Sequence, residues 1–414
     1  MQSLITLGKA AKSAGQKLAS LGTEVKNNAL LAMADALVAN ADFILSENEK
    51  DLENGRNAGM NESLLDRLAL SKDRISSMAD GIRQIVALPD PIGEVLHMTK
   101  RPNGLKIGKV RVPLGVIAII YEARPNVTAD AAALCLKAGN AVILRGGKEA
   151  INSNAAIEKV MLDAAISAGM PNGCMALVKD TTRESANALM RLNDYVDVII
   201  PRGGAGLIRA VVENATVPAI ETGTGNCHVY VDKDADLKMA AKIVINAKTS
   251  RPSVCNAEEK LLVHKDVADE FLNEILPKLA ELGVEIRGGE CVRKIYPSAT
   301  PVTDNDWKTE YLDLIIAVRI VDDLDTAIAH INENGSKHSE AIVTTNYENS
   351  QRFLDEVDAA AVYVNASTRF TDGFEFGFGA EIGISTQKMH ARGPMGLAEL
   401  TTIKYIIYGT GQIR

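Results

Sequence analysis

Residues 113–200 repeat one unit, a short apolar run rich in β-branched residues followed by an Ala-rich stretch with helical spacing. The apolar runs are continuous instead of alternating with polar residues, which is typical of strands covered on both faces. Because parallel strands need a crossover between them, the repeat predicts an α/β fold with a parallel sheet. The predicted strands are residues 114–120, 141–144, 175–178 and 196–200, separated by helices that include 129–138 and 152–168.

A second region of the same kind follows a predicted boundary near residues 229–236. Its expected strands lie near residues 259–263, 314–321, 341–344 and 361–364. A chain of 414 residues exceeds one ordinary domain. We therefore expect two parallel-sheet αβ domains.

The segments outside these two regions have a different pattern of apolar residues. Apolar residues at three-and-four spacing predict one long helix over residues 24–45, and similar patterns predict helices over 61–70 and 73–88. Pro102-Asn103-Gly104 lies between two alternating segments, so residues 98–112 are expected to form a β-hairpin. This hairpin is a candidate projecting arm, and the last predicted strand is 404–408.

Composition excludes several classes of function. The 53 acidic residues outnumber the 45 Lys and Arg, and aromatic residues make up 4%, which argues against nucleic-acid binding. No stretch approaches the roughly 18 apolar residues of a membrane span. The five Cys include no C-x-x-C pair and the six His form no metal-ligand pattern, so we expect a reducing, cytoplasmic setting with neither disulfides nor a metal site.

Cys255 stands apart from the other cysteines because it lies in a polar, turn-like stretch just before a strand. Cys135 and Cys174 have apolar or helix-flanking surroundings typical of structural residues, and Cys291 lies in a charged run. Cys227 is a weaker second candidate. On local grounds alone, a nucleophilic thiol and an unreactive one are equally good interpretations of Cys255.

Anion-binding groups are expected where strands end. Gly203-Gly204-Ala205-Gly206 joins a predicted strand to a helix, where backbone N–H groups can bind a phosphate, although a tight turn without a ligand fits equally well. The usual G-x-G-x-x-G fingerprint is absent. Arg124, Arg202 and Arg369 also follow strands and could converge on a carboxylate or phosphate, whereas each alone is more often a surface salt bridge.

Several longer motifs together resemble the gamma-glutamyl phosphate reductase family of the aldehyde dehydrogenase superfamily. The resemblance covers essentially the whole chain, with one departure at Asn334, where the family usually has Tyr or His. The motifs are Tyr121-Glu122-Ala123-Arg124-Pro125-Asn126-Val127-Thr128, Pro201-Arg202-Gly203-Gly204, Arg251-Pro252-Ser253-Val254-Cys255-Asn256-Ala257, Gly335-Ser336-Lys337-His338-Ser339-Glu340 and Gly379-Ala380-Glu381-Ile382-Gly383-Ile384-Ser385-Thr386.

The resemblance implies NADPH-dependent reduction of L-glutamate 5-phosphate to L-glutamate 5-semialdehyde and phosphate, the second step of proline biosynthesis. The Cys255 thiolate would attack the acyl phosphate and form a thioester. The Asn126 amide and the Cys255 N–H would stabilise the oxyanion. Glu221 occupies the place of the base that activates water in hydrolytic relatives, and it is expected to be auxiliary because water would waste the thioester.

The resemblance also assigns the binding residues. Lys148, where NAD-preferring relatives have Glu, would accept the 2′-phosphate of NADPH with Arg145 nearby, and Glu310 would hold the nicotinamide ribose. The pyrophosphate would lie near Gly203 and Gly204. The expected substrate ligands are Arg124, Arg202, Ser336, His338, Asn365 and Arg369.

By the same resemblance, residues 1–97 and 113–228 form the cofactor-binding domain and 229–385 the catalytic domain. Residues 98–112 and 386–414 form a small β oligomerisation arm, so a homodimer or homotetramer is expected. The product of glutamate 5-kinase is labile, which makes a transient complex with that kinase plausible. The alternatives are a hydrolytic or CoA-acylating aldehyde dehydrogenase that uses the same Cys, and a catalytically silent scaffold of the same fold.

Overall fold

The computed structural model describes residues 2–414 and divides the chain into two compact units. Unit 1 contains residues up to Glu221, then Gly377–Gly383 and Met395–Arg414. Unit 2 contains Thr222–Phe376 and Ile384–Pro394. Residues 222–228, predicted for the cofactor-binding domain, therefore fall in unit 2, because Cys227 and His228 begin a strand of its sheet.

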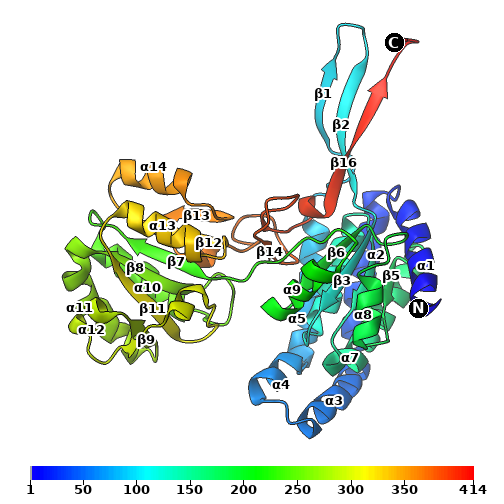
Figure 1. Cartoon of the computed structure of the whole chain (residues 1–414). Helices are drawn as coiled ribbons and strands as arrows, with labels where there is room; N and C mark the ends of the chain where they lie inside the picture. Colours follow the sequence, from blue (N-terminus) through cyan, green and yellow to red (C-terminus); the bar gives the residue numbers. More distant parts are fainter. Residues whose placement is uncertain (1) are drawn as a thin grey trace. The chain divides into compact units, whose positions relative to one another are not determined.

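A four-stranded parallel sheet with the order β5-β4-β3-β6 is the centre of unit 1. Helices α6 and α7 pack together on one face, while α1 packs on β3 to β5 and contacts α8 (Figure 1). This confirms the parallel sheet predicted from the continuous apolar runs. The elements are α1 (Gln2–Leu18), β3 (Val116–Tyr121), α6 (Asn126–Lys137), β4 (Ala141–Arg145), the 3-10 helix η1 (Lys148–Ala150), α7 (Ile151–Ser167), β5 (Met175–Leu177), α8 (Arg183–Leu189), β6 (Val198–Arg202) and α9 (Ala205–Asn214).

The strand order creates a topological switch point between β3 and β6. From β3 the chain proceeds outward to β4 and β5, and then returns to the other side of β3 to form β6. At their carboxyl ends, Tyr121 and Arg202 are paired in register. In open parallel sheets, ligands bind at the carboxyl edge beside such a reversal.

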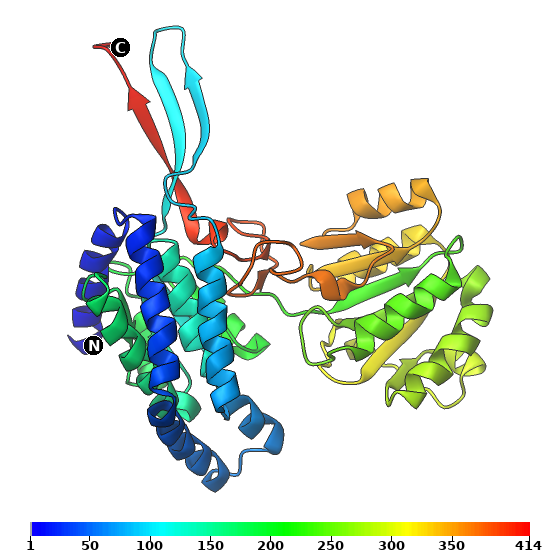
Figure 2. The same ribbon diagram turned by 180° about the vertical axis from the view of Figure 1, so that it is seen from behind.

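Of the remaining N-terminal helices, α2, α3 and α5 form an outer layer on α6 and α7, and α4 packs on α3 (Figure 2). The single helix predicted over 24–45 is wrong, because the chain bends by 67° at Asn40 between α2 and α3. Asn40 has a non-helical backbone, and its side-chain amide donates to the Ala36 carbonyl. The helices are α2 (Thr23–Ala39), α3 (Ala41–Asn57), α4 (Glu62–Leu68) and α5 (Lys72–Ala87).

A three-stranded antiparallel sheet, in the order β1-β2-β16, projects from unit 1 (Figure 1). The predicted hairpin is confirmed as β1 (Val95–Lys100) and β2 (Lys106–Pro113), and the 3-10 helix η4 (Ala398–Leu400) leads into β16 (Thr401–Tyr408). This projecting sheet exposes large apolar side chains, namely Val95, Leu96, Met98, Ile403, Tyr405, Ile407 and Tyr408.

Unit 2 is built on a seven-stranded parallel sheet with the order β10-β9-β11-β8-β7-β12-β13. Along β7, Val229 and Val231 pack against the cluster that includes α10 and α11, while Tyr230 packs against the one that includes α13 and α14. The strands are β7 (Cys227–Val231), β8 (Glu258–His264), β9 (Glu285–Gly288), β10 (Thr300–Pro301), β11 (Ile315–Val321), β12 (Ser339–Val343) and β13 (Ala361–Val364).

Helices connect these strands, and a short antiparallel pair completes the unit. The helices are α10 (Leu237–Thr249), α11 (Lys265–Glu281), α12 (Glu290–Ile295), η2 (Asp304–Lys308), α13 (Leu324–Asn334), α14 (Tyr347–Glu356) and η3 (Thr368–Phe370); the pair is β14 (Ile384–Ser385) with β15 (Gly393–Pro394).

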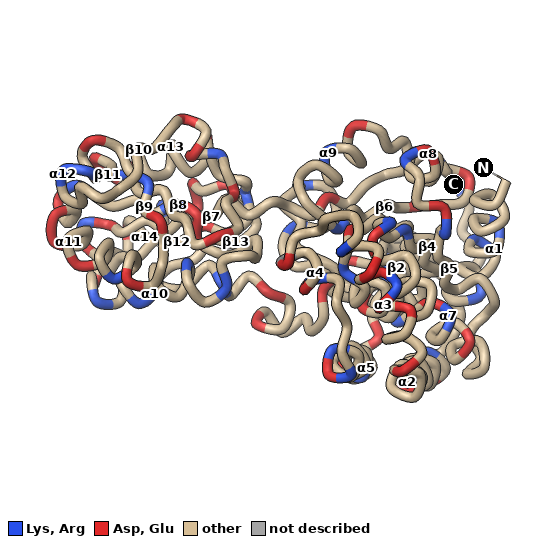
Figure 3. Tube along the Cα trace, turned by 90° about the horizontal axis from the view of Figure 1, so that it is seen from below, with Lys and Arg blue, Asp and Glu red and all other residues tan. Residues whose placement is uncertain are grey.

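Basic and acidic residues are interspersed along the helices of both units (Figure 3). Over residues 2–414, no single helix is both long and apolar enough to cross a membrane; the bent pair α2 and α3 passes the same test by length and composition alone.

Candidate active site

Cys255 lies in unit 2, on the turn that joins α10 to β8 at the amino edge of the sheet. The turn is closed by a hydrogen bond from the Ala257 N–H to the Val254 carbonyl. Cys255 is partly exposed, whereas Cys135, Cys174 and Cys227 are buried and Cys291 is exposed. The structural surroundings predicted for Cys135 and Cys174 are therefore confirmed.

Gly225 packs directly against the backbone of Cys255. A Cβ atom at Gly225 would lie 1.4 Å from the Cys255 carbonyl oxygen and 2.2 Å from its carbonyl carbon. Only glycine is compatible with this approach, because real Cβ contacts essentially never fall below 3.0 Å. The position of the thiol-bearing turn thus depends on the absence of a side chain at residue 225.

Hydrogen bonds from unit 2 hold the segment that contains Gly225. The Gly225 N–H donates to Glu310 Oε1 at 2.7 Å, and the Asn226 N–H donates to Ser336 Oγ at 2.8 Å. The Asn226 amide also donates to the backbone carbonyls of Trp307 and Asn334 at 2.7 and 2.9 Å. Two predicted ligands, Glu310 and Ser336, therefore position the chain next to Cys255.

Arg369 contacts the other side of the same turn. Its guanidinium donates to the side chain of Asn256 and, through Nε, to Ser250 Oγ at 3.1 Å. Thr368 Oγ1 donates to the Asn256 carbonyl at 2.8 Å. Burial lowers the pKa of Arg369, and the positive charge of Arg251 acts in the same direction. A partly buried cation beside the cysteine turn is suited to bind an anionic group of a substrate.

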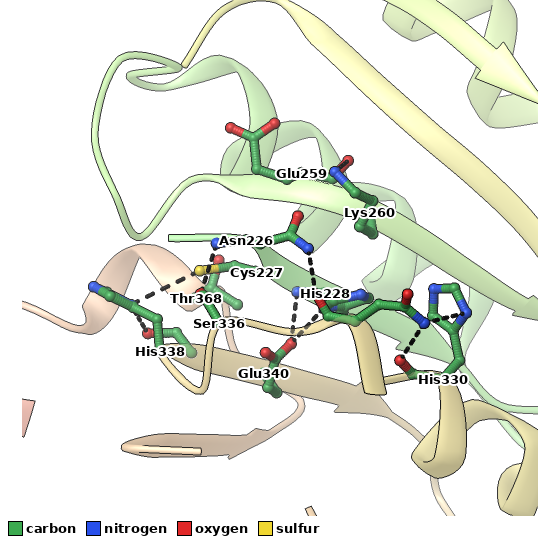
Figure 4. A network of polar contacts seen from close by, with 12 residues as sticks. Asn226, Cys227, His228, Glu259, Lys260, His330, Ser336, His338, Glu340 and Thr368 are labelled. Atoms are coloured by element: carbon green, nitrogen blue, oxygen red, sulfur yellow. Dashed lines mark hydrogen bonds and ion pairs between the residues drawn. The ribbon is translucent and has the colours of Figure 1, made fainter. Parts of the chain in front are cut away.

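A buried polar network that includes Cys227 and His338 (Figure 4) contacts the backbone of Cys255. The Cys227 thiol donates to the Cys255 carbonyl at 3.2 Å and lies 3.8 Å from His338 Nδ1, which is 2.8 Å from Ser339 Oγ. Burial raises the pKa of Cys227 far above its usual range and lowers that of His338 to about 4, so both are neutral. His338 is completely buried, so it has no surface with which to touch a substrate in this structure.

A row of ionisable residues crosses three strands on the face covered by α13. His228 is paired in register with Lys260 on one side and Glu340 on the other, and His228 Nδ1 lies 2.9 Å from Glu340 Oε2. Burial lowers the pKa of His228 to about 3, lowers that of Lys260 to about 8, and raises that of Glu340 well above its usual range. Sequence reasoning missed this row; its one sequence signal was Lys260, a charged residue inside the strand predicted near residues 259–263.

Asn365 is an exposed residue whose side-chain amide is hydrogen-bonded to the backbone just after β12. Its backbone is left-handed, with φ 59°, and its amide both donates to the Thr344 carbonyl and accepts from the Thr344 N–H, each at 2.9 Å. Its predicted role as a substrate ligand would require breaking this pair of bonds.

In unit 1, the predicted phosphate turn lies at the switch point between β3 and β6. Gly204 caps α9, and its N–H donates to the carboxylate of Glu122 at 2.9 Å. A Cβ at Gly203 would lie 2.7 Å from the Glu122 carboxyl carbon. The helix N-terminus therefore already binds an anionic group, supplied by the residue that follows β3.

Arg145 is the last residue of β4, at the same edge of that sheet, and Lys148 follows shortly after it. Arg145 Nη2 donates to the carbonyls of Thr181 and Thr182 at 2.6 and 3.0 Å, while its buried Nε has no hydrogen-bond partner. Lys148 is exposed at the start of η1. Lys148 is the more accessible of these two predicted cofactor ligands.

Asn126 is the first residue of α6, and its side chain is exposed. Its amide donates to Asp130 Oδ2, one turn later, at 3.1 Å. Arg202 stabilises the Asp130 carboxylate electrostatically, and Arg124, before α6, is exposed.

The predicted residues thus form two sets. Within the described residues, no group of three His, Cys, Asp or Glu could hold a metal ion. Unit 2 brings together Cys255, Glu310, Ser336, His338 and Arg369, and unit 1 brings Arg124, Asn126, Arg202, Gly203 and Gly204 to one edge of its sheet.

Comparison with known proteins identifies close relatives. Residues 5–288 match the aldehyde dehydrogenase family. Gamma-glutamyl phosphate reductases of Carboxydothermus hydrogenoformans and of Clostridium botulinum (strain Alaska E43) are each 64% identical to this chain over 414 residues, which cover all of both chains in each comparison.

Solved structures agree with these sequence matches. The crystal structure of gamma-glutamyl phosphate reductase from Thermotoga maritima has 50% identity and a TM-score of 0.98, with 99% of each chain covered. An acetylating aldehyde dehydrogenase from Geobacillus thermoglucosidasius shares the fold at 19% identity, with a TM-score of 0.69 over 100% of this chain and 98% of that one.

Proposed function

The chain belongs to the gamma-glutamyl phosphate reductase family of the aldehyde dehydrogenases, and on this basis we propose that it reduces L-glutamate 5-phosphate to L-glutamate 5-semialdehyde with NADPH. It is an oxidoreductase, and its family implies a nicotinamide cofactor. The reaction would supply the semialdehyde for proline biosynthesis. The observation that carries the proposal is the partly exposed Cys255 on a turn fixed by Gly225 and Arg369.

Cys255 would act as the nucleophile. Its thiolate attacks the acyl carbon of the substrate, the bond to the phosphate oxygen breaks, and phosphate leaves with that bonding pair. The product is a thioester on Cys255. A thiolate suits this chemistry because it is strongly nucleophilic and also leaves readily when the aldehyde is released.

The tetrahedral intermediate places a negative charge on the former carbonyl oxygen. The Asn126 amide and the Cys255 backbone N–H would donate to that oxygen, and such donors contribute about 10²- to 10³-fold to kcat each. Exposure of the Asn126 amide at the start of α6 supports this role.

The residues of unit 1 fit a dinucleotide with a 2′-phosphate. The α9 N-terminus already binds one carboxylate, from Glu122, so it can accept a phosphate oxygen in the same place. Lys148 is exposed after β4 to meet the 2′-phosphate, with Arg145 nearby. Glu310, which belongs to unit 2, would bind the nicotinamide ribose. NADPH, when bound, supplies the hydride that converts the thioester to the aldehyde and restores the thiolate.

The charged substrate would be bound mainly by arginines. Arg369 lies against the Cys255 turn, and Arg124 and Arg202 lie at the carboxyl edge of the unit 1 sheet. Ser336 and Asn365 would act by holding the backbone around the substrate, because their polar groups already bind Asn226 and Thr344. His338 would act without touching the substrate, through its contact with Cys227, whose thiol donates to the Cys255 carbonyl.

The decisive experiment is NADP-linked oxidation of glutamate semialdehyde with and without inorganic phosphate. The proposal expects a rate that requires phosphate and is lost in Cys255→Ala. A rate independent of phosphate would instead indicate the hydrolytic chemistry, and a rate that requires CoA the acylating one. Glu221→Gln should keep substantial activity, because no water has to be activated; a loss equal to that of Cys255→Ala would overturn this assignment.

The exposed apolar side chains of the projecting sheet support assembly into a homodimer or homotetramer. We also propose a cytoplasmic enzyme that meets glutamate 5-kinase transiently, since the acyl phosphate is labile.

A further inference from the structure

We infer that Asp130 is a positioning residue for the oxyanion-stabilising amide of Asn126. This inference rests on the proposed function, because it assumes that Asn126 contacts the reacting oxygen. Asp130 would act only through Asn126, by fixing which end of that amide is presented to the substrate.

The two side chains are placed on one face of α6. Asn126 and Asp130 are four residues apart, a spacing at which helical side chains are neighbours. Asn126 Nδ2 donates to Asp130 Oδ2 at 3.1 Å. Asn126 is exposed, whereas Asp130 is partly buried, so the carboxylate supports the amide from the protein side.

The chemistry of the acceptor determines the orientation of the amide. A carboxamide has a donor end and an acceptor end of nearly the same shape, and nothing in its own structure selects one of them. An ionised carboxylate can only accept hydrogen bonds. It therefore binds the NH₂ end of Asn126 and leaves the second N–H of that group available to an oxyanion.

Asp130 is still mostly ionised at neutral pH, although its surroundings raise its pKa. Burial raises the pKa of Asp130 to about 6, and the hydrogen bond from Asn126 and the positive charge of Arg202 oppose that rise. On α5, Gly81 packs beside the carboxylate: a Cβ there would lie 3.7 Å from Asp130 Oδ1, an ordinary van der Waals distance.

Without the carboxylate, the Asn126 amide could turn over and direct its carbonyl oxygen toward the substrate. The partly negative carbonyl oxygen of the amide would then face the oxyanion as the tetrahedral intermediate forms. The penalty affects the reacting state and not the bound ground state, so it should appear in kcat and leave KM nearly unchanged.

A double-mutant cycle tests this role. We expect Asn126→Ala to lower kcat about 10²-fold and Asp130→Ala to lower it about 10-fold or more, with KM changed less than about twofold in each. In the Asn126→Ala background, Asp130→Ala should have no further effect on kcat. Asp130→Asn keeps a carbonyl acceptor and should recover part of the loss seen with Asp130→Ala.

Controls separate a specific effect from unfolding. Asp163→Ala removes a carboxylate that pairs with Lys159 at the same four-residue spacing on α7, and it should leave kcat unchanged. Iodoacetamide should alkylate Cys255 at the wild-type rate in all these variants, because alkylation forms no oxyanion. If Asp130→Ala does not fold, the cycle is measured with Asp130→Asn.

Two outcomes have different meanings. If Asn126→Ala lowers kcat while Asp130→Ala does not, or if the two losses multiply in the double variant, the inference about Asp130 is overturned and the proposed function stands. If Asn126→Ala itself leaves kcat unchanged, the oxyanion role of Asn126 within the proposed function fails.

Discussion

Replacing Gly225 with Ala should separate activity from stability in one substitution. The added Cβ would lie 1.4 Å from the Cys255 carbonyl oxygen, where at least 3.0 Å is needed, so the two backbones must move apart by at least about 1.6 Å, the difference of these distances. A displacement of about 1 Å at a reacting group can cost about 10²-fold in rate, or about 2.7 kcal/mol in barrier height. We therefore expect kcat to fall by at least about 10²-fold. Overpacking of this kind costs about 1–3 kcal/mol of stability, which leaves the protein folded.

The assay measures kcat for phosphate-dependent semialdehyde oxidation, the thermal midpoint, and the alkylation rate of the Cys255 peptide by mass spectrometry. Gly289→Ala is the matched control, since residue 289 is also in unit 2 and a Cβ there has no neighbour within 4 Å. The control should keep wild-type kcat. Wild-type kcat and an unchanged Cys255 alkylation rate in Gly225→Ala would refute the argument that this contact positions the nucleophile.

Two further predictions concern unit 1. Glu122→Gln removes a negative charge that occupies the α9 N-terminus, so the KM for NADPH should fall; an unchanged or higher KM in steady-state kinetics would contradict this. For Asp130, burial raises the pKa from 3.8 to about 6, so the folded protein holds this proton more tightly than the unfolded chain does. As the pH rises from 4 to 6, the thermal midpoint of the wild type should therefore fall relative to that of Asp130→Asn. The corresponding loss in the free energy of unfolding is at most about 3 kcal/mol. A difference between these two midpoints that does not vary with pH would contradict the raised pKa.

The sequence predicted the fold class because strands buried on both faces, such as β3 and β4, are continuous runs of apolar residues. The sequence was less informative where a helix ends through a hydrogen bond between a side chain and the backbone, as at Asn40. The break at Asn40 interrupts no apolar periodicity, so the stripe over 24–45 gave no sign of it. β9 and β10 were missed because they contain Glu285, Arg287 and Thr300, which do not resemble a buried parallel strand.

For the candidate site, the sequence supplied the residues and not their contacts. Cys255 could be singled out by its polar turn, and the structure shows its partial exposure. The packing of Gly225 on Cys255 joins positions 30 residues apart, as the numbering shows, and no local pattern encodes it. Nor could the binding of Glu122 at Gly204 be predicted, because it depends on the strand order that places β6 beside β3.

The pairing of β16 with β2 sets a constraint on how the chain matures on the ribosome. About 290 residues separate Pro113 from its partner Thr401, and at a synthesis rate of 5–20 residues per second this interval lasts roughly 15 to 60 s. During that time one edge of β2 has no strand to pair with, and unpaired edges are templates for aggregation. The nascent hairpin is thus the segment for which shielding by a chaperone, or by a second nascent copy, matters most.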